Sequence, residues 1–154
     1  MQTLDEIVAS APIFAELHQD DLLTIAGCSR TAQFAEGEYV FREGQQADVF
    51  YLLRRGAVAL ETFAPGRGPL RLATVHEGEI LGWSWLFAPY RWHFDARALE
   101  STRAVAFDGE CLRGKCDEDH DLGYELMQRF AQIMVSRLQA TRFQLLDVYG
   151  NGRG

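Results

Sequence analysis

The sequence has no excess of basic residues. Its 154 residues include 15 Lys and Arg against 22 Asp and Glu, which gives a formal net charge of -7 at pH 7. Proteins that bind nucleic acids by neutralising phosphates carry clustered positive charge. The composition therefore argues against direct DNA binding by this chain, and the sequence shows no helix-turn-helix element after its last helical pattern.

Long apolar runs are also missing. The sequence has no uninterrupted apolar stretch of about 18 residues, which a membrane-spanning helix requires. The N-terminal residues, MQTLDEIVAS, are acidic and lack the basic and apolar regions of a signal peptide. We therefore expect a cytoplasmic protein that does not enter a membrane.

Cysteine and histidine are scarce and scattered. The three cysteines, Cys28, Cys111 and Cys116, form no CxxC motif, which is typical of reduced thiols in a cytoplasmic protein. The four histidines show no metal-ligand spacing, and no Ser-His-Asp arrangement or phosphate-binding glycine loop occurs. We predict no metal site, no required cofactor and no enzymatic activity.

Glycines separate short apolar runs through the middle of the chain. These runs are rich in β-branched and aromatic residues, which is typical of strands, and no helical pattern lies between them. The predicted strands are 39–41, 49–53, 57–60, 70–75 and 102–107, with a hairpin loop at 64–69. We predict a mainly β fold with flanking helices, a double-stranded β-helix of the jelly-roll or cupin-like kind with antiparallel pairing.

Helical periodicity flanks this β region on both sides. Two short helices are predicted within residues 3–27, and a single short helix around 111–116. A long helix is predicted over 124–149. The expected organisation is a β-roll domain over 1–123, a dimerisation helix over 124–149 and a flexible tail over 150–154.

The long helix carries two apolar faces. One face repeats at alternating spacings of four and three, as in a coiled coil. It consists of Met127, Ala131, Met134, Leu138, Thr141, Leu145 and Val148. The other face, with Leu126, Phe130 and Ile133, is expected to pack on the β domain. We predict a homodimer through residues 127–148; in the alternative, the whole helix folds back on its own barrel.

Aromatic residues are concentrated in residues 77–98, EGEILGWSWLFAPYRWHFDARA, here called the aromatic segment. It holds all three tryptophans of the chain and two arginines, Arg91 and Arg97. Two interpretations compete. The aromatic side chains either fill a core or wall a small-molecule pocket in which Arg91 or Arg97 contacts an anion.

The run FAEGEYVFREGQQADVFYLLRRGAVAL resembles the first strands of cyclic nucleotide-binding domains of the CRP/FNR type. The order of two short helices, a glycine-punctuated barrel and a long C-terminal helix agrees with this family. The resemblance covers about residues 5 to 148. The residues that match the spaced frame are Gly37, Val40, Gly44, Ala47, Asp48, Tyr51, Leu53, Gly56 and Val58.

The resemblance implies that the aromatic segment is the phosphate-binding cassette of that family. There a Gly-Glu pair precedes a short helix, and a later arginine pairs with the cyclic phosphate while the glutamate holds the ribose hydroxyl. Here Trp83 stands in place of the glutamate and Trp85 in place of a small residue. An indole donates but cannot accept a hydrogen bond. Counting from Pro89 assigns the arginine position to Arg91, whereas counting back from Arg97 assigns it to Trp92.

The candidate ligand-binding residues are Gly82, Trp83, Ser84, Trp85, Leu86, Arg91, Trp92 and Arg97. We predict a sensor module that binds a small anionic or nucleotide-like effector, with cyclic AMP and cyclic GMP as first candidates. It would signal through its C-terminal helix. The alternative is a ligand-free domain whose aromatic side chains fill the pocket and which acts as a dimeric protein-interaction module.

Overall fold

The computed structural model describes residues 2–151 of the chain. The side chain of Val148 and residues 152–154 of the predicted tail lie outside the described residues. The elements, in chain order, are α1 (Leu4–Ser10), η1 (Pro12–Phe14), α2 (Gln19–Gly27), β1 (Ser29–Phe34), β2 (Tyr39–Phe41), β3 (Val49–Arg55), β4 (Val58–Ala64), β5 (Gly68–Val75), β6 (Ile80–Leu81), η2 (Ser84–Leu86), β7 (Asp95–Ala98), β8 (Thr102–Asp108), α3 (Gly109–Glu118) and α4 (His120–Asn151).

The strands form two four-stranded sheets, in the orders β1-β8-β3-β6 and β2-β7-β4-β5. All pairings are antiparallel. The predicted jelly-roll fold with two short N-terminal helices and a long C-terminal helix is confirmed. The five predicted strands and the short helix around 111–116 are present, while β1, β6 and β7 were not predicted.

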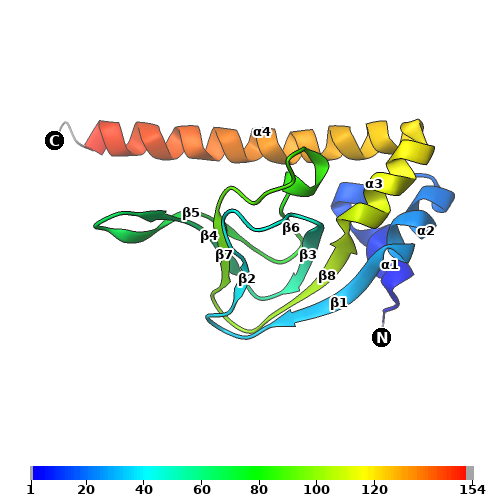
Figure 1. The fold of residues 1–154 in the computed structure, drawn as a ribbon, viewed down its shortest axis with the longest axis horizontal. Coiled ribbons are helices and arrows are strands. Elements are labelled where there is room, and N and C mark those ends of the chain that lie inside the picture. The colour runs from blue at the N-terminus through cyan, green and yellow to red at the C-terminus, as the bar shows by residue number, and fades with distance from the viewer. Residues whose placement is uncertain (1, 152–154) are drawn as a thin grey trace.

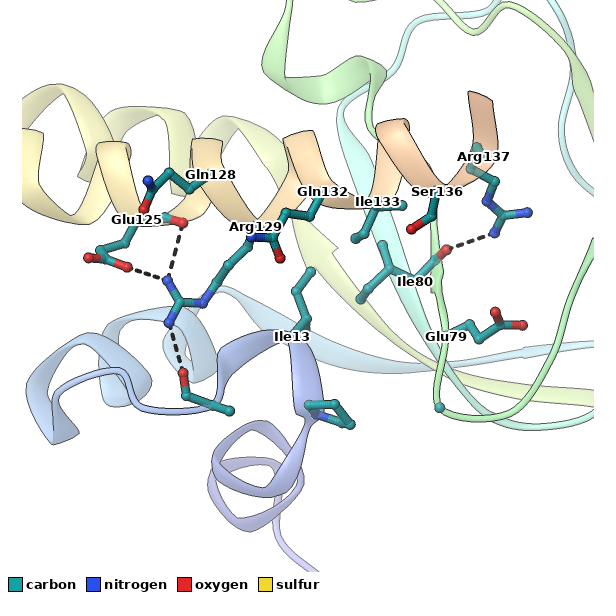
Figure 2. Close-up of a pocket in the computed structure, with 13 residues that line it drawn as sticks. Ile13, Glu79, Ile80, Glu125, Gln128, Arg129, Gln132, Ile133, Ser136 and Arg137 are labelled. Carbon is teal, nitrogen blue, oxygen red and sulfur yellow. Dashed lines mark hydrogen bonds and ion pairs between the residues drawn. The ribbon is translucent and has the colours of Figure 1, made fainter. Parts of the chain in front are cut away.

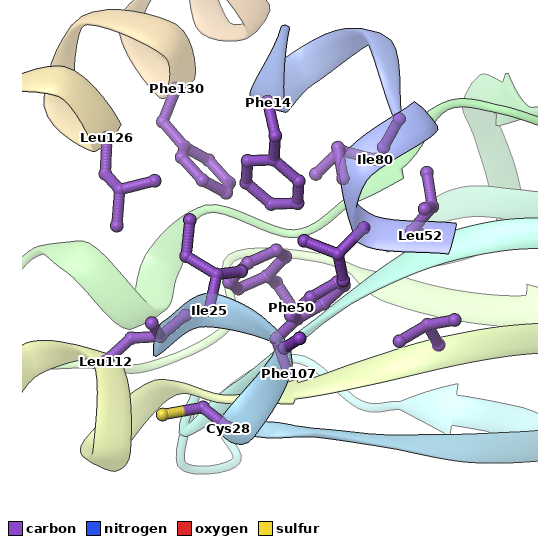
Figure 3. Packing of buried hydrophobic residues seen from close by; sticks show 14 of the residues in the cluster. Phe14, Ile25, Cys28, Phe50, Leu52, Ile80, Phe107, Leu112, Leu126 and Phe130 are labelled. Atoms are coloured by element: carbon purple, nitrogen blue, oxygen red, sulfur yellow. The ribbon is translucent and has the colours of Figure 1, made fainter. Parts of the chain in front are cut away.

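The sheet β1-β8-β3-β6 separates two hydrophobic clusters. The first, here called the helical core, lies between this sheet and the helices, and Figure 3 shows Phe14, Leu126 and Phe130 converging there on Phe50. The second, the barrel core, lies between the two sheets and includes Tyr51. Because side chains alternate along a strand, neighbouring residues of β3 serve different cores.

Helix α4 runs along the whole barrel, and the β4–β5 hairpin extends beside its C-terminal half (Figure 1). The predicted packing face is buried or half-buried, with Leu126, Phe130 and Ile133 on the helical core. By contrast, Met127, Leu138 and Leu145 of the face with the four–three spacing are exposed. That face, with the seven residues named for it in the sequence analysis, is here called the α4 seam. None of the helices in residues 2–151 is both long and apolar enough to cross a membrane.

The prediction of three reduced thiols is wrong for two of them. Cys28 and Cys111 form a disulfide, although 83 residues separate them in sequence. The β1–β8 ladder explains the proximity, since the Asp108 N–H donates to the Cys28 carbonyl over 2.8 Å, and α3 begins at the next residue. The thiol of Cys116 stays free.

Candidate ligand-binding site

In the second half of the aromatic segment, residues 90–92 pair with the loop before β3, and Asp95–Ala98 continue as β7 between β2 and β4. Gly44 N–H donates to Trp92 O over 2.9 Å, and Trp92 N–H donates to Gln45 O over 3.0 Å. From Arg91 to Ala98 the sequence alternates strictly between polar and apolar residues. The apolar residues of this run, Trp92, Phe94 and Ala96, therefore lie in the barrel core, while Arg91 lies on the exposed side.

Trp92 fills the barrel interior. Its side chain is 2% exposed, and its ring stacks on Phe41 with centroids 3.7 Å apart and planes 6° from parallel. Gly82 makes room for this indole, because a Cβ at position 82 would lie 2.7 Å from the Trp92 ring. Gly82 also has φ of +98°, a conformation that L side chains rarely adopt.

Trp85 belongs to the helical core. It is fully buried, stacks on Phe50 with centroids 4.9 Å apart and meets Phe130 edge to face at 5.3 Å. Ser84 is buried beside it, and Leu86 is half-buried against the same cluster. Within residues 2–151, the Nε1 of Trp85 and the Oγ of Ser84 are buried without a hydrogen-bond partner.

Trp83 is half-buried and contacts both hydrophobic clusters. It meets Phe94 edge to face at 5.8 Å. Trp83 also borders a cavity of about 540 Å³ between α4 and the β4–β5 hairpin, here called the hairpin pocket. This pocket is lined by Leu60, Leu72, Ala73, Thr74, Glu79, Trp83, Met134, Ser136, Arg137, Leu138, Ala140 and Thr141. Of the candidate residues named from the sequence, Trp83 is the one that lines this pocket.

The two candidate arginines have different surroundings. Arg91 is exposed on the outer side of the barrel. Arg97 forms a bidentate ion pair with the buried Glu61, at 3.0 and 2.9 Å. The hydrogen bonds from Arg97 hold the pKa of Glu61 below its usual value against the opposing effect of burial. The same hydrogen bonds raise the pKa of Arg97.

A third arginine, Arg137 of α4, was not predicted. Its Nη2 donates to the Ile80 carbonyl over 3.5 Å, a long hydrogen bond. Burial lowers its pKa, and the nearby Glu79 partly offsets this effect. The face that carries Phe130 and Ile133 reaches position 137 four residues later, so helical periodicity could have indicated a barrel-facing arginine.

Arg137 also borders a second cavity of about 640 Å³ between α4, η1 and the turn before β6. Figure 2 shows Arg137 and Arg129 near opposite ends of this cavity, with Ile133 between them. Arg129 is already engaged, since it pairs with Glu125 and donates to Ala15 O over 2.8 Å. Arg137, Ser136 and Glu79 line both cavities and so form the wall between them.

Arg113 of α3 fixes the first half of the aromatic segment from outside. It donates to the Trp85 carbonyl over 2.6 Å and to Asp48 Oδ1 over 3.0 Å. Its guanidinium carbon lies 4.1 Å from the centroid of the Tyr90 ring. No sequence pattern marked this residue, because its partners lie 65 or fewer residues upstream in unrelated elements. Arg113 therefore links α3 to the segment that contains most of the candidate residues.

Comparison with known proteins agrees with this architecture. Residues 31–119 match the family described as the cyclic nucleotide-binding domain. The chain is 25% identical over 145 residues to a CRP-like cAMP-activated global transcriptional regulator of Mycobacterium tuberculosis. That match covers 94% of this chain and 63% of the regulator, so the chain spans less than two thirds of this relative.

Two solved structures are also similar. A Geobacter metallireducens protein assigned to the cyclic nucleotide-binding proteins is 30% identical with a TM-score of 0.79, over 90% of this chain and 99% of that chain. A cyclic nucleotide-binding domain from Methylobacillus flagellatus has a TM-score of 0.78 at 18% identity, over 94% and 81% of the two chains. The second likeness shows the fold alone. The family match over residues 31–119 and the identity to the Geobacter protein show that this chain belongs to the cyclic nucleotide-binding domain family.

Proposed function

We propose that this chain is a non-enzymatic sensor module that binds a small anionic effector in the hairpin pocket and signals through α4. The observation that carries the proposal is the composition of that pocket. Trp83 from the aromatic segment and Arg137 from α4 line the same cavity of about 540 Å³. A ligand there would touch both the segment that the family uses for binding and the helix that leaves the domain.

The pocket chemistry favours an effector with a flat, partly apolar body and one anionic group. Leu60, Leu72 and Met134 supply apolar walls, and the Trp83 indole offers a surface for stacking. The Arg137 guanidinium is half-buried, and within residues 2–151 it makes one long hydrogen bond, to a carbonyl, beside Glu79, which only partly offsets the effect of burial. A charge with so little compensation in a partly desolvated site gains from an anionic partner.

Cyclic AMP and cyclic GMP are the first candidates. The relative from Mycobacterium tuberculosis is cAMP-activated, and the chain belongs to a family defined by binding such nucleotides. In this chain the Trp92 indole occupies the barrel interior, so the anion would be held by Arg137 in the hairpin pocket. Arg91 remains a predicted contact that the experiment below compares with Arg137. Arg97, also predicted, is paired with Glu61.

The output would pass through α4 to a second copy of the chain. Ser136, Arg137 and Thr141 line the pocket. Leu138 of the α4 seam also lines it and is largely exposed, as is Leu145. Closing the pocket on an effector would shift α4 and so change the geometry of a homodimer formed through residues 127–148. We place this module in the cytoplasm, without direct DNA contact by the present residues.

A specific observation favours the second candidate, a ligand-free interaction module. The stacked pair Trp92 and Phe41 fills the barrel from within, as expected for a domain that has replaced its ligand with its own side chains. In this case the hairpin pocket would hold only water, and α4 alone would carry the function.

The deciding experiment is a titration of the purified chain with cyclic AMP, cyclic GMP and a panel of nucleotides and aromatic carboxylates. Binding is followed by calorimetry and by tryptophan emission, which the half-exposed Trp83 should report. Saturable binding by a panel member supports the sensor. A flat response in both readouts supports the ligand-free module.

Two matched variants locate the anion contact. Arg137→Gln keeps a hydrogen-bond donor but removes the charge, and we expect it to weaken binding by about 10- to 100-fold. Arg91→Gln makes the same change on the outer side of the barrel and should leave affinity unchanged. The reverse order would assign the anion contact to Arg91 and reject Arg137.

A further inference from the structure

The disulfide between Cys28 and Cys111 fastens the start of α3 to the end of α2. Cys28 caps α2 and is 6% exposed, whereas Cys111 lies in the first turn of α3 and is half-buried. Their Cα atoms are 5.9 Å apart. Figure 3 shows the Cys28 sulfur at the edge of the helical core, turned toward α3. A reagent from solvent would therefore reach the Cys111 sulfur more readily.

Helix α3 connects this disulfide to the aromatic segment. Its first residue, Gly109, donates to Asp48 O over 2.7 Å, and a Cβ there would lie 3.0 Å from the Cβ of Trp85. One turn later, Arg113 holds the Trp85 carbonyl and covers the Tyr90 ring. The position of α3 thus sets the position of residues 84–90.

Helix α3 also leads directly into α4. Asp119 is the one residue between the two helices. The Cys116 side chain packs closely against Gly123 of α4, where a Cβ would lie 3.2 Å from the Cys116 Cβ. A movement of α3 would therefore reach both the aromatic segment and the base of α4.

We propose that the Cys28–Cys111 pair is a reversible redox-modification site that a protein or small-molecule dithiol reduces. Its state would set how firmly α3 holds the aromatic segment. The proposal rests on the cytoplasmic location proposed above. In that compartment persistent disulfides are uncommon, and those that occur are mostly catalytic or redox-sensing. It does not depend on which effector binds.

The reaction is a two-electron thiol–disulfide exchange. A thiolate of the reductant attacks Sγ of Cys111, the bond to Cys28 breaks, and Cys28 leaves as a thiolate that takes up a proton. The second thiol of the reductant then attacks the mixed disulfide and releases Cys111. The chain gains two electrons and two protons, and the dithiol becomes a disulfide. Cys116 takes no part; burial raises the pKa of its thiol, which makes it a poor nucleophile.

The first test asks whether the bond exists and cycles. The full chain is purified without reductant, its free thiols are alkylated in denaturant, and its intact mass is measured. We expect one alkylated cysteine, Cys116, before treatment with a dithiol and three after it. Air or a disulfide oxidant should restore the first state. Three alkylated cysteines in chain that was never reduced, or a bond that resists a folded-state dithiol, would overturn the proposal.

The second test asks whether the bond controls the aromatic segment. Hydrogen exchange is compared between oxidised and dithiol-treated chain, and we expect about tenfold faster exchange in residues 84–90 and 109–118 after reduction. The β4–β5 hairpin, far from α3, is the internal reference. Equal exchange rates in the two states would show that the disulfide is a passive cross-link and would contradict the proposal.

Cysteine variants distinguish the effect of breaking the disulfide from side effects of the dithiol. The double variant Cys28→Ser and Cys111→Ser should show the reduced exchange pattern and no response to dithiol. Cys116→Ser should behave as the wild-type chain does in both states. If the double variant fails to fold, reduction and reoxidation of the wild-type chain still decide the question. A dithiol response that survives in the double variant would contradict the assignment.

Discussion

At the scale of single residues, Glu61 shows how a carboxylate is tolerated inside the fold. It is 4% exposed, and both of its oxygens accept hydrogen bonds from Arg97. A buried charge that lost this partner would keep the cost of desolvation without the compensating ion pair. The pair therefore stabilises the β4–β7 contact as long as Glu61 is ionised.

The first prediction follows from that ion pair. Arg97→Ala should lower the free energy of unfolding at pH 7 by about 2 kcal/mol. The folded-state pKa of Glu61 is lowered, so the stabilisation is complete above the ordinary glutamate pKa and is lost as pH falls through the lowered value. Urea unfolding from pH 7 to pH 3 should show the gap between wild type and variant closing in acid.

The control for this prediction is Arg42→Ala. Arg42 pairs with Asp95 over 3.3 Å, but half of its side chain is exposed. Asp95 is buried, but the solvated Arg42 side weakens the pair, so we expect this variant to lose only about 1 kcal/mol and to remain closer to wild type. Equal losses for both arginines would contradict the importance assigned to burial.

The second prediction concerns the glycine beneath Trp92. Gly82→Ala would bring a Cβ within 2.7 Å of a ring that is stacked on Phe41 and cannot withdraw. We expect a loss of about 2–3 kcal/mol from strain and displacement of the indole. Gly66→Ala is the matched control, because Gly66 also has a positive φ, of +82°, but no atom lies within 4 Å of the added Cβ.

Chemical denaturation of the two glycine variants provides the measurement. The control should lose only about 1 kcal/mol, the cost of an L residue in the left-handed region. The difference between the variants then measures the contact with Trp92. If the two losses are equal, Trp92 does not fill the barrel in the way described.

At the scale of elements, α4 is organised by its two faces. One packs on the helical core through Leu126 and Phe130. On the other face, Leu138 and Leu145 of the α4 seam are 70% and 54% exposed. Exposed large apolar residues that repeat every seventh position are typical of a helix whose partner is another helix.

The third prediction tests this partner. Leu138→Glu should convert a dimer to monomers, because it would place a charge at the centre of the contact. Phe143→Glu is the matched control. Phe143 is equally exposed, at 66%, but lies five residues further along and so points away from Leu138 by roughly 140°. Light scattering across a concentration series gives the mass. A monomeric wild type, or a dimer lost equally in both variants, would rule out the proposed interface.

Some helices and strands could be predicted from sequence patterns, and others could not. Apolar strands such as β3 and β4 and the periodic helix α4 were predicted from their patterns. Strand β7 was not predicted, although residues 91–98, which include it, alternate strictly between polar and apolar residues. That alternation places Trp92 inside and Arg91 outside, and it could have been recognised. Strand β6, only two residues long, offers no such pattern.

The site was less predictable than the fold, for a physical reason. Trp83, Trp85 and Trp92 look alike in sequence, yet the structure puts them in the wall of a cavity, the helical core and the barrel core respectively. Which of these three environments an indole occupies depends on how segments that are distant in the sequence pack together. Arg137 and the Cys28–Cys111 bond likewise depend on contacts between segments more than 50 residues apart.

At the scale of the whole molecule, the disulfide closes a loop that contains almost the entire barrel. Cys28 precedes β1 and Cys111 follows β8, so all eight strands lie between them. A cross-link over such a loop strongly restricts the conformations of the unfolded chain.

The fourth prediction is the size of this effect. With 83 residues between the cysteines, reduction should lower the free energy of unfolding by about 4 kcal/mol and the melting temperature by roughly 10 °C. Calorimetry with and without a dithiol measures both. Cys116→Ser should melt as the wild type does in each condition. A melting temperature that is unaffected by reductant would show that the bond is absent in solution.

The central strands β3 and β8, buried on both faces along most of their length, have a consequence for how this chain can evolve. Along β3, Phe50 and Leu52 face the helices, while Tyr51 and Leu53 face the barrel. Substitutions at adjacent positions of β3 are therefore selected by contacts in two different cores. Among related sequences, substitutions at 50 and 52 should co-vary with positions on α4, and those at 51 and 53 with positions on β7. A lineage could therefore change the side chains that fill its barrel while it conserves the contact between β3 and α4.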